Sequence, residues 1–177
     1  FSFIMRRIIT AYRHAQGWHN VLKNDQVQDP TLTSIGMMQA ARSKGHRAEV
    51  VLCSPLTRTL QTASHMFPDT PIIALDCLIE YPFTDKANKR MSIVSLREVF
   101  PNINFNMLGH VNQKGVDPDE FLKRQFEEFK DKLSMFPYRN IAVVGHSTWI
   151  HSYILGKPSI PNVELPHCEP FVLEKYD

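Results

Sequence analysis

Arginine and histidine side chains recur where apolar, strand-like runs end. The residues at these places are Arg13 and His14, Ser54 with Arg58 one turn later, and His146. Because ligands bind at the carboxyl ends of the strands in an open α/β sheet, we expect these side chains to converge. Two guanidinium groups suit phosphate oxygens, and they bias a nearby histidine toward its neutral, nucleophilic form. The pattern predicts a phosphate site, although Arg13 and His14 alone would equally fit a polar surface loop.

Alternating strands and helices are expected to position these residues. Apolar, β-branched runs predict strands over residues 4–12, 50–54, 71–75, 141–145 and 170–174. Helical spacing and stop signals predict helices from a Thr33 cap to before Gly45, and over residues 57–66, 93–100, 117–136 and 149–155. Residues 82–91 and 102–116 are expected to be irregular. This order predicts a three-layer α/β/α fold with a mostly parallel central sheet, in one domain over residues 1–177.

The helix expected after Asp117 and Pro118 carries a stripe of large apolar side chains. The stripe is Leu122, Phe126, Phe129, Leu133 and Phe136. Its alternating steps of four and three residues are typical of a face packed on a core, which we prefer to a cofactor groove.

Composition limits the kinds of binding partner and the cellular compartment that we expect for this protein. A net charge of +2 is too small to indicate nucleic acid or an anionic membrane, and no apolar run approaches the roughly 20 residues of a membrane span. The three cysteines, Cys53, Cys77 and Cys168, form no CxxC pair, so we expect neither a disulfide framework nor a zinc site. With no secretory signal recognised, we expect a reducing, cytoplasmic location. The sequence begins at Phe1 rather than methionine, which is compatible with a missing upstream segment.

Four stretches, in order, resemble the motifs of the histidine phosphatase superfamily, which includes the cofactor-dependent phosphoglycerate mutases. Residues 13–16 (Arg-His-Ala-Gln) match its Arg-His-Gly-Glu/Gln, and residues 29–40 match its Asp-Pro-x-Leu-Thr-x-x-Gly-x-x-Gln-Ala. Residues 54–63 match its Ser-Pro-Leu-x-Arg-x-x-Gln-Thr-Ala, and residues 143–147 stand where its second histidine motif belongs. The resemblance covers nearly the whole chain and implies the phosphoglycerate mutase-like fold.

The resemblance also implies a role for each matching residue. His14 would attack phosphorus and become a phosphohistidine. The phosphoryl oxygens would be held by Arg13, Arg58 and His146, with help from Asn20. Glu80 would protonate the leaving oxygen and then activate water. No metal or cofactor is implied. Because Asp76 and Asp85 are close to Glu80 in sequence, a solvated acidic residue after a strand remains an alternative for Glu80.

Some assignments stay open at this stage. Gln16 and Arg90 are candidates for contacts with the rest of the substrate, although the basic residues 86–90 are more simply a solvated surface. His19, His151 and Trp149 fit either the pocket or packing. Ala15 replaces the motif glycine, which would strain the backbone only if its φ were positive. We expect a negative φ.

The resemblance favours a phosphatase. Residues 17–20 (Gly-Trp-His-Asn) and 96–105 are similar to a phosphatase-like branch found in fungi and plants, so we expect hydrolysis of a small phosphorylated substrate. The alternatives are a phosphoglycerate mutase-type phosphotransferase and a non-catalytic domain that binds a phosphorylated ligand or a protein. The loops at 82–92 and 102–117 would set selectivity. A homodimer is compatible with the sequence, which does not determine the oligomeric state.

Overall fold

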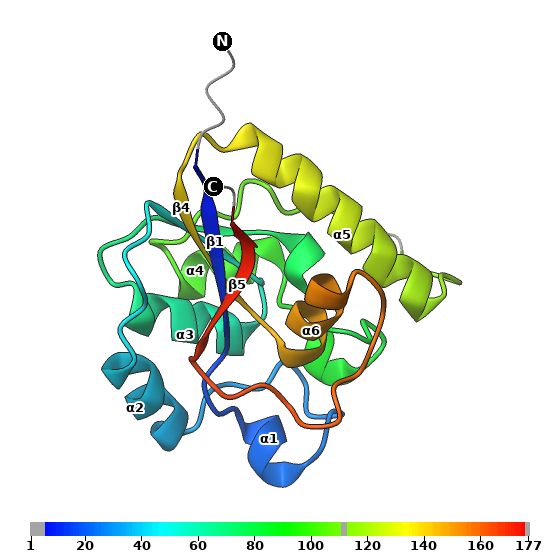
Figure 1. The fold of residues 1–177 in the computed structure, drawn as a ribbon. Helices are drawn as coiled ribbons and strands as arrows, with labels where there is room; N and C mark the ends of the chain where they lie inside the picture. Colours follow the sequence, from blue (N-terminus) through cyan, green and yellow to red (C-terminus); the bar gives the residue numbers. More distant parts are fainter. Residues whose placement is uncertain (1–5, 111–112, 176–177) are drawn as a thin grey trace.

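A computed structural model of the chain describes residues 6–110 and 113–175, and its described strands form one sheet in the order β3-β2-β4-β1-β5 (Figure 1). The strands are β1 (Ile8–Arg13), β2 (Val50–Cys53), β3 (Ile72–Ala74), β4 (Asn140–Gly145) and β5 (Pro170–Lys175). All neighbours run parallel except β5, which is antiparallel to β1 at the sheet edge. This confirms the predicted α/β class and mostly parallel sheet. Residues 4 and 5 of the first predicted strand lie outside the described residues.

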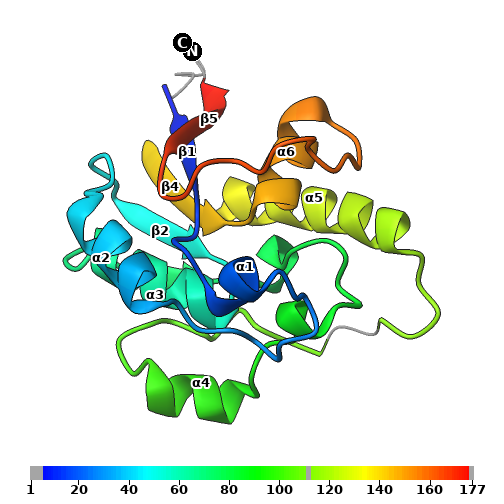
Figure 2. The same ribbon diagram turned by 90° about the horizontal axis from the view of Figure 1, so that it is seen from below.

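Helices cover both faces of the sheet (Figures 1 and 2). On one face lie α5 (Pro118–Met135) and α6 (Ser147–Leu155); on the other lie α2 (Ser34–Arg42), α3 (Thr57–Met66) and α4 (Ile93–Val99). Side chains alternate along a strand, so each strand contributes to both layers. Ile9 and Ala11 of β1 pack with α5 and α6, whereas Tyr12 packs with α3.

The apolar stripe on α5 packs in the core, as predicted. Leu122, Phe126, Phe129 and Leu133 are buried, and Phe136 packs against them. Phe126 and Phe129 meet the ring of Trp149 edge-on, with centroids 5.4 Å and 5.2 Å away. Trp149 is also buried, and its indole N–H donates to the Cys77 carbonyl at 2.9 Å. Trp149 therefore belongs to the core rather than to a pocket.

Helix starts follow capping signals where the cap is local. The Thr33 hydroxyl accepts the Gly36 N–H at 3.0 Å, and the Asp117 carboxylate accepts two N–H groups at the start of α5 at 3.1 Å. Helix α6 begins at Ser147, two residues before the predicted start, because a distant carboxylate, Glu80, accepts the N–H groups of its first turn.

Three short elements were not predicted. They are α1 (Trp18–Leu22) and the 3₁₀ turns Asp76–Leu78 and Lys86–Asn88. Each has five residues or fewer, which is too short to show helical periodicity. Helix α1 follows the carboxyl end of β1 in the chain, so it lies beside the residues described next (Figure 2).

The described cysteines, Cys53, Cys77 and Cys168, are all buried and free. Within residues 6–110 and 113–175, no helix combines the length and apolar character needed to cross a membrane.

Candidate active site

Sheet neighbours bring the predicted residues together. Arg13, the last residue of β1, pairs in register with Gly145 of β4, so His14 and His146 leave adjacent strands at the same edge. The His14 N–H donates to the Gly145 carbonyl at 3.0 Å, and the Ser54 N–H donates to the Val144 carbonyl at 3.1 Å. The three strand ends that the sequence singled out therefore meet at one place.

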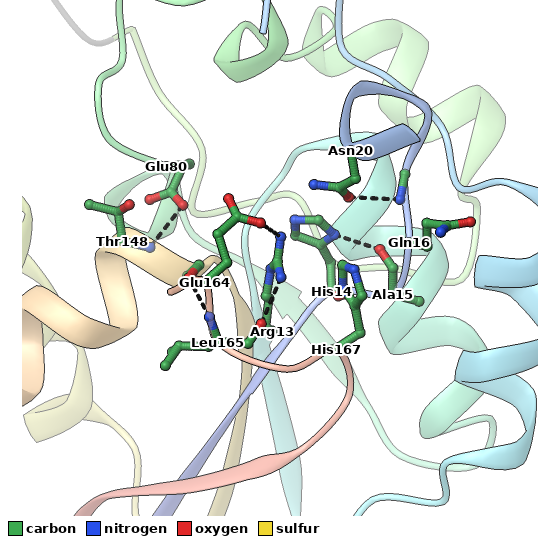
Figure 3. A network of polar contacts seen from close by, with 12 residues as sticks. Arg13, His14, Ala15, Gln16, Asn20, Glu80, Thr148, Glu164, Leu165 and His167 are labelled. Carbon is green, nitrogen blue, oxygen red and sulfur yellow. Dashed lines mark hydrogen bonds and ion pairs between the residues drawn. The ribbon is translucent and has the colours of Figure 1, made fainter. Parts of the chain in front are cut away.

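His14 is held as a neutral ring with one free nitrogen. Its Nδ1 lies 2.6 Å from the Ala15 carbonyl oxygen (Figure 3). Because a carbonyl only accepts, Nδ1 carries the proton and Nε2 keeps its lone pair. Burial, and then the positive charge of Arg58, hold the pKa of His14 well below its usual range. His14 is thus uncharged and able to act as a nucleophile at neutral pH.

Both arginines are buried, and each is fixed through its terminal nitrogens. Arg58 donates to the Ala87 carbonyl at 2.7 Å and to Asn88 Oδ1 at 2.8 Å. Arg13 donates to the Leu165 carbonyl at 2.6 Å and pairs with the Glu164 carboxylate at 2.5 Å (Figure 3). In each arginine, Nε is buried and has no partner. These bonds hold both guanidinium groups rigidly, while the Nε–H donor of each arginine remains available.

Three further histidine rings surround His14, and the nearer two belong to His19 and His146. The rings of His19 and His146 each have their centroid 5.4 Å from that of His14. His146 is completely buried, and its Nε2 lies 2.8 Å from Ser54 Oγ. Burial lowers the pKa of His19 to about 3 and holds that of His146 well below its usual range, so both are neutral.

The unpartnered nitrogens of the site form a set. Among the described residues, the buried side-chain nitrogen or oxygen atoms without a hydrogen-bond partner are Arg13 Nε, Arg58 Nε, His19 Nδ1 and His146 Nδ1. Buried polar groups are nearly always paired, so such a cluster of nitrogens indicates a site built for a ligand that accepts hydrogen bonds. With two guanidinium groups in the set, an anion fits best.

Glu80 lies across the site from His14 (Figure 3). Its carboxylate accepts the N–H groups of Tyr81 at 2.8 Å, Trp149 at 2.9 Å and Thr148 at 3.1 Å. Burial raises the pKa of Glu80 to about 7, although these hydrogen bonds and Arg58 oppose the shift. A carboxyl group with this pKa can give a proton and take one back near neutral pH.

These groups open onto a cavity of about 200 Å³. Its walls include Arg13, His14, His19, Arg58, Glu80, Asn88, Asp25, Asp85 and Glu164. His146, whose ring is next to that of His14, is not among the residues that line the cavity. In the described part of the chain, no group of three or more His, Cys, Asp or Glu side chains is arranged to hold a metal ion. A larger cavity of about 650 Å³, at the end of α5, contains none of the predicted site residues.

Besides His146, three predicted residues lie outside this cavity. Asn20 accepts the Gly17 N–H at 3.0 Å (Figure 3) and so caps α1, and Gln16 accepts the Thr33 hydroxyl at 2.8 Å. Arg90 pairs with Asp76 at 2.7 Å and lines a separate cavity of about 240 Å³. Of the open candidates, His19 lines the site, while His151 lies 3.3 Å from the Ser159 hydroxyl, away from it.

Several motif residues support the loop that carries His14 rather than the cavity. Thr62 accepts the Ala15 N–H at 3.0 Å, and Gln39 accepts the Gln16 N–H at 2.9 Å. The segment after α1 is held in the same way, because the Leu32 N–H donates to the Gln61 side chain at 2.8 Å. The non-glycine residues with positive φ in the described chain are Lys23, Asp29 and Cys168, so Ala15 replaces the motif glycine without that strain.

Glu164, His167 and Asp25 are among the residues of the site that the sequence analysis did not single out. Glu164 pairs with Arg13, and His167 donates from Nδ1 to the His14 carbonyl at 2.6 Å. Both come from the loop before β5. Tyr12 pairs with Pro170 where antiparallel β5 begins, so the residues preceding β5 must reach the carboxyl end of β1. A prediction from the sequence that β5 pairs with β1 would have pointed to Glu164 and His167.

Comparison with known proteins agrees with this arrangement. The model of the histidine phosphatase superfamily (branch 1) matches residues 9–169. A phosphoglycerate mutase-like protein of Arabidopsis thaliana is 24% identical, over 92% of this chain and 82% of its own. In fold, the chain is similar to the phosphoserine phosphatase of Entamoeba histolytica, solved with 3-phosphoglyceric acid (TM-score 0.63, 20% identity, covering 97% of each chain).

A second similar structure is the ecdysone phosphate phosphatase of Bombix mori, solved with tungstate. It has a TM-score of 0.66 and 16% identity, over 93% of this chain and 88% of its own. Because the family model spans almost all of the sheet, both histidine motifs and the arginine positions, the chain belongs to branch 1 of the histidine phosphatase superfamily.

Proposed function

We propose that the protein is a phosphomonoesterase that hydrolyses a small phosphorylated substrate through a phosphohistidine on His14. The observation that carries the proposal is the set of buried nitrogens without partners around a neutral histidine. A phosphoryl group placed there would accept from Arg13 Nε and Arg58 Nε while facing His14 Nε2. The two structural neighbours named as phosphatases are consistent with hydrolysis.

In the first step, His14 Nε2 attacks phosphorus and the bond from phosphorus to the ester oxygen breaks. The arginines are fixed before substrate arrives, so they stabilise the negative charge of the transition state with little rearrangement. Glu80, whose pKa is about 7, supplies the proton that the leaving oxygen needs. The products of this step are the free alcohol and phosphorylated His14.

In the second step, the ionised Glu80 removes a proton from a water molecule, which attacks phosphorus. The nitrogen–phosphorus bond breaks, inorganic phosphate leaves, and His14 and Glu80 regain their starting protonation states. Arg13 and Arg58 hold the phosphoryl oxygens in both steps. Splitting hydrolysis in two in this way replaces one difficult displacement by two easier ones.

The test is phosphate release by wild type and by His14→Ala from p-nitrophenyl phosphate and a panel of phosphorylated metabolites. We expect His14→Ala to lose at least about a thousandfold in kcat, because it removes the nucleophile. His65→Ala is the matched control, since His65 is exposed on α3 and outside the cavity; it should retain wild-type activity. Wild type quenched in alkaline detergent should also contain a phosphoryl group that is stable in base, labile in acid and absent from His14→Ala.

Substantial phosphate release by His14→Ala would contradict the mechanism. Isomerisation of a phosphorylated substrate without free phosphate would favour the phosphotransferase alternative. Binding of phosphate without any turnover would favour the non-catalytic one.

A further inference from the structure

The cavity around His14 is basic at its floor and acidic at its mouth. The guanidinium groups of Arg13 and Arg58 are buried, and the histidines of the floor are neutral. Nearer the solvent, the wall contains Asp25 and Glu164, both exposed, and Asp85, which is half-buried. The carboxylates at the mouth thus outnumber the guanidinium groups, even with Glu80 left aside.

The acidic side chains lie close to both arginines. Glu164 pairs directly with Arg13. On the other side, the Asp25 carbonyl accepts the Ala87 N–H at 2.9 Å, and the Ala87 carbonyl accepts from Arg58 at 2.7 Å. Asp25 and the turn that follows Asp85 are therefore held against the Arg58 side of the cavity.

Asp25 and Asp85 are not neutralised within the protein. Neither carboxylate has a hydrogen bond or ion pair to another residue that the structure describes, and Asp25 lies close enough to raise the pKa of Asp85. Lys89 attracts Asp85, but its ammonium group donates to Gln113 at 3.1 Å and lies over the Phe83 ring, and Lys89 does not line this cavity.

This distribution creates a conflict for a simple phosphate ester. The buried, unpartnered Arg13 Nε and Arg58 Nε mark a place for an anion at the floor. A phosphate dianion bound there would share the cavity with the carboxylates of Asp25 and Asp85, and like charges repel. A positive group on the same substrate, directed toward the mouth, would remove that repulsion and give these carboxylates a partner.

We propose that the preferred substrates are phosphomonoesters that carry a protonated amine or a similar cationic group within a few bonds of the phosphate. Asp25 and Asp85 are the specificity-determining residues that bind this group. Glu164 contributes from the opposite wall through its pair with Arg13. The proposal rests on the phosphatase function proposed above and adds the chemical class of the substrate.

The experiment compares three small probes of similar size: O-phosphoethanolamine, propyl phosphate and 2-phosphoglycolate, which carry an ammonium, a methyl and a carboxylate group at the same place. We expect wild type to prefer the ammonium probe to propyl phosphate by about tenfold or more in kcat/KM, and to disfavour the carboxylate probe further. Where turnover of a probe is slow, its inhibition constant against p-nitrophenyl phosphate compares the binding of the probes instead.

The variants are Asp25→Asn, Asp85→Asn and the double variant. Each single change should lower the preference about threefold, and the double variant should nearly abolish it. Asp69→Asn is the matched control, because it removes the same charge from an exposed residue outside the cavity, and it should preserve the preference.

Two failures can be told apart. If p-nitrophenyl phosphate and all three probes release no phosphate that depends on His14, the proposed function fails and this inference with it. If release depends on His14 but propyl phosphate or 2-phosphoglycolate is used as well as the ammonium probe, the substrate class is wrong. A preference that persists in the double variant would remove Asp25 and Asp85 from the explanation.

Discussion

Burial acts on His14 and Glu80 in the same way but prepares them for opposite tasks. Withdrawal from water disfavours the charged form of any group. For His14 the disfavoured form is the cation, so the ring stays neutral and nucleophilic; for Glu80 it is the anion, so its pKa rises to about 7. One physical cause therefore suits both residues to the roles proposed for them, His14 as nucleophile and Glu80 as acid, near neutral pH.

Glu80→Gln tests the acid role. For an alkyl phosphate we expect kcat to fall by about 10²–10⁴, because the leaving oxygen no longer receives a proton. Wild-type activity on that substrate should decline as pH rises above about 7, where Glu80 loses its proton, and the variant should lack this decline. Initial rates from pH 5 to 9 check both points. Glu98→Gln, a change of an exposed glutamate outside the cavity, is the control. An unchanged pH profile in Glu80→Gln would remove Glu80 from the mechanism.

At the scale of elements, the loop after β1 depends on how closely α2 approaches it. A Cβ added to Gly36 would lie 2.0 Å from the Gln16 carbonyl oxygen, so only glycine fits there. The neighbouring contacts from Thr33 and Gln39 to Gln16 hold the helix in the same place. Close packing against the loop that carries His14 therefore explains why the motif over residues 29–40 has a glycine at position 36.

Gly36→Ala should destabilise the protein by roughly 1–3 kcal/mol, the usual range for an overpacked site. Because the backbone of Gln16 must move, kcat should fall as well. Urea unfolding and p-nitrophenyl phosphate turnover measure the two effects. Gly109→Ala is the matched control, since a Cβ there meets nothing within 4 Å. Equal stability of the two variants would mean that the contact with Gln16 is not limiting.

The elements that could be predicted from the sequence are those with local signals. The helix over Thr57–Met66 has the predicted bounds, and the caps at Thr33 and Asp117 form as expected. The start of α6 was misplaced because its cap comes from Glu80, 68 residues away. The same reason explains Glu164 and His167: each reaches the site through the pairing of β5 with β1, which no local pattern reveals.

At the scale of the whole molecule, the buried histidines link stability to pH. In the unfolded chain they titrate near 6.5, whereas burial lowers the pKa of His19 to about 3 and holds those of His14 and His146 well below the usual range. Below pH 6.5 the unfolded state therefore binds protons that the folded state does not. This contribution to stability is intact above pH 6.5 and is lost as pH falls toward the folded values. Glu80, with its raised pKa, contributes in the opposite sense, and its contribution is lost as pH rises through about 7.

We expect the free energy of unfolding to fall between pH 6.5 and pH 4, with a slope that His19→Asn reduces by up to one proton per molecule. Urea unfolding at constant ionic strength measures the slope. His65→Asn should leave it unchanged, because His65 is exposed. A wild-type slope that His19→Asn does not alter would show that other groups control acid stability.

The position of β1 in the sheet has a consequence for synthesis. His14 is synthesised before both neighbours of its strand, which are β4, at Asn140–Gly145, and β5, at Pro170–Lys175. Pairings between such distant segments form slowly, because a long loop must close first. The residues that fix Arg13 and the His14 carbonyl, Glu164 and His167, also arrive late. A chain that stalls between β1 and β5 thus displays His14, the proposed nucleophile, without its site, which is assembled only after Glu164 and His167 have been synthesised.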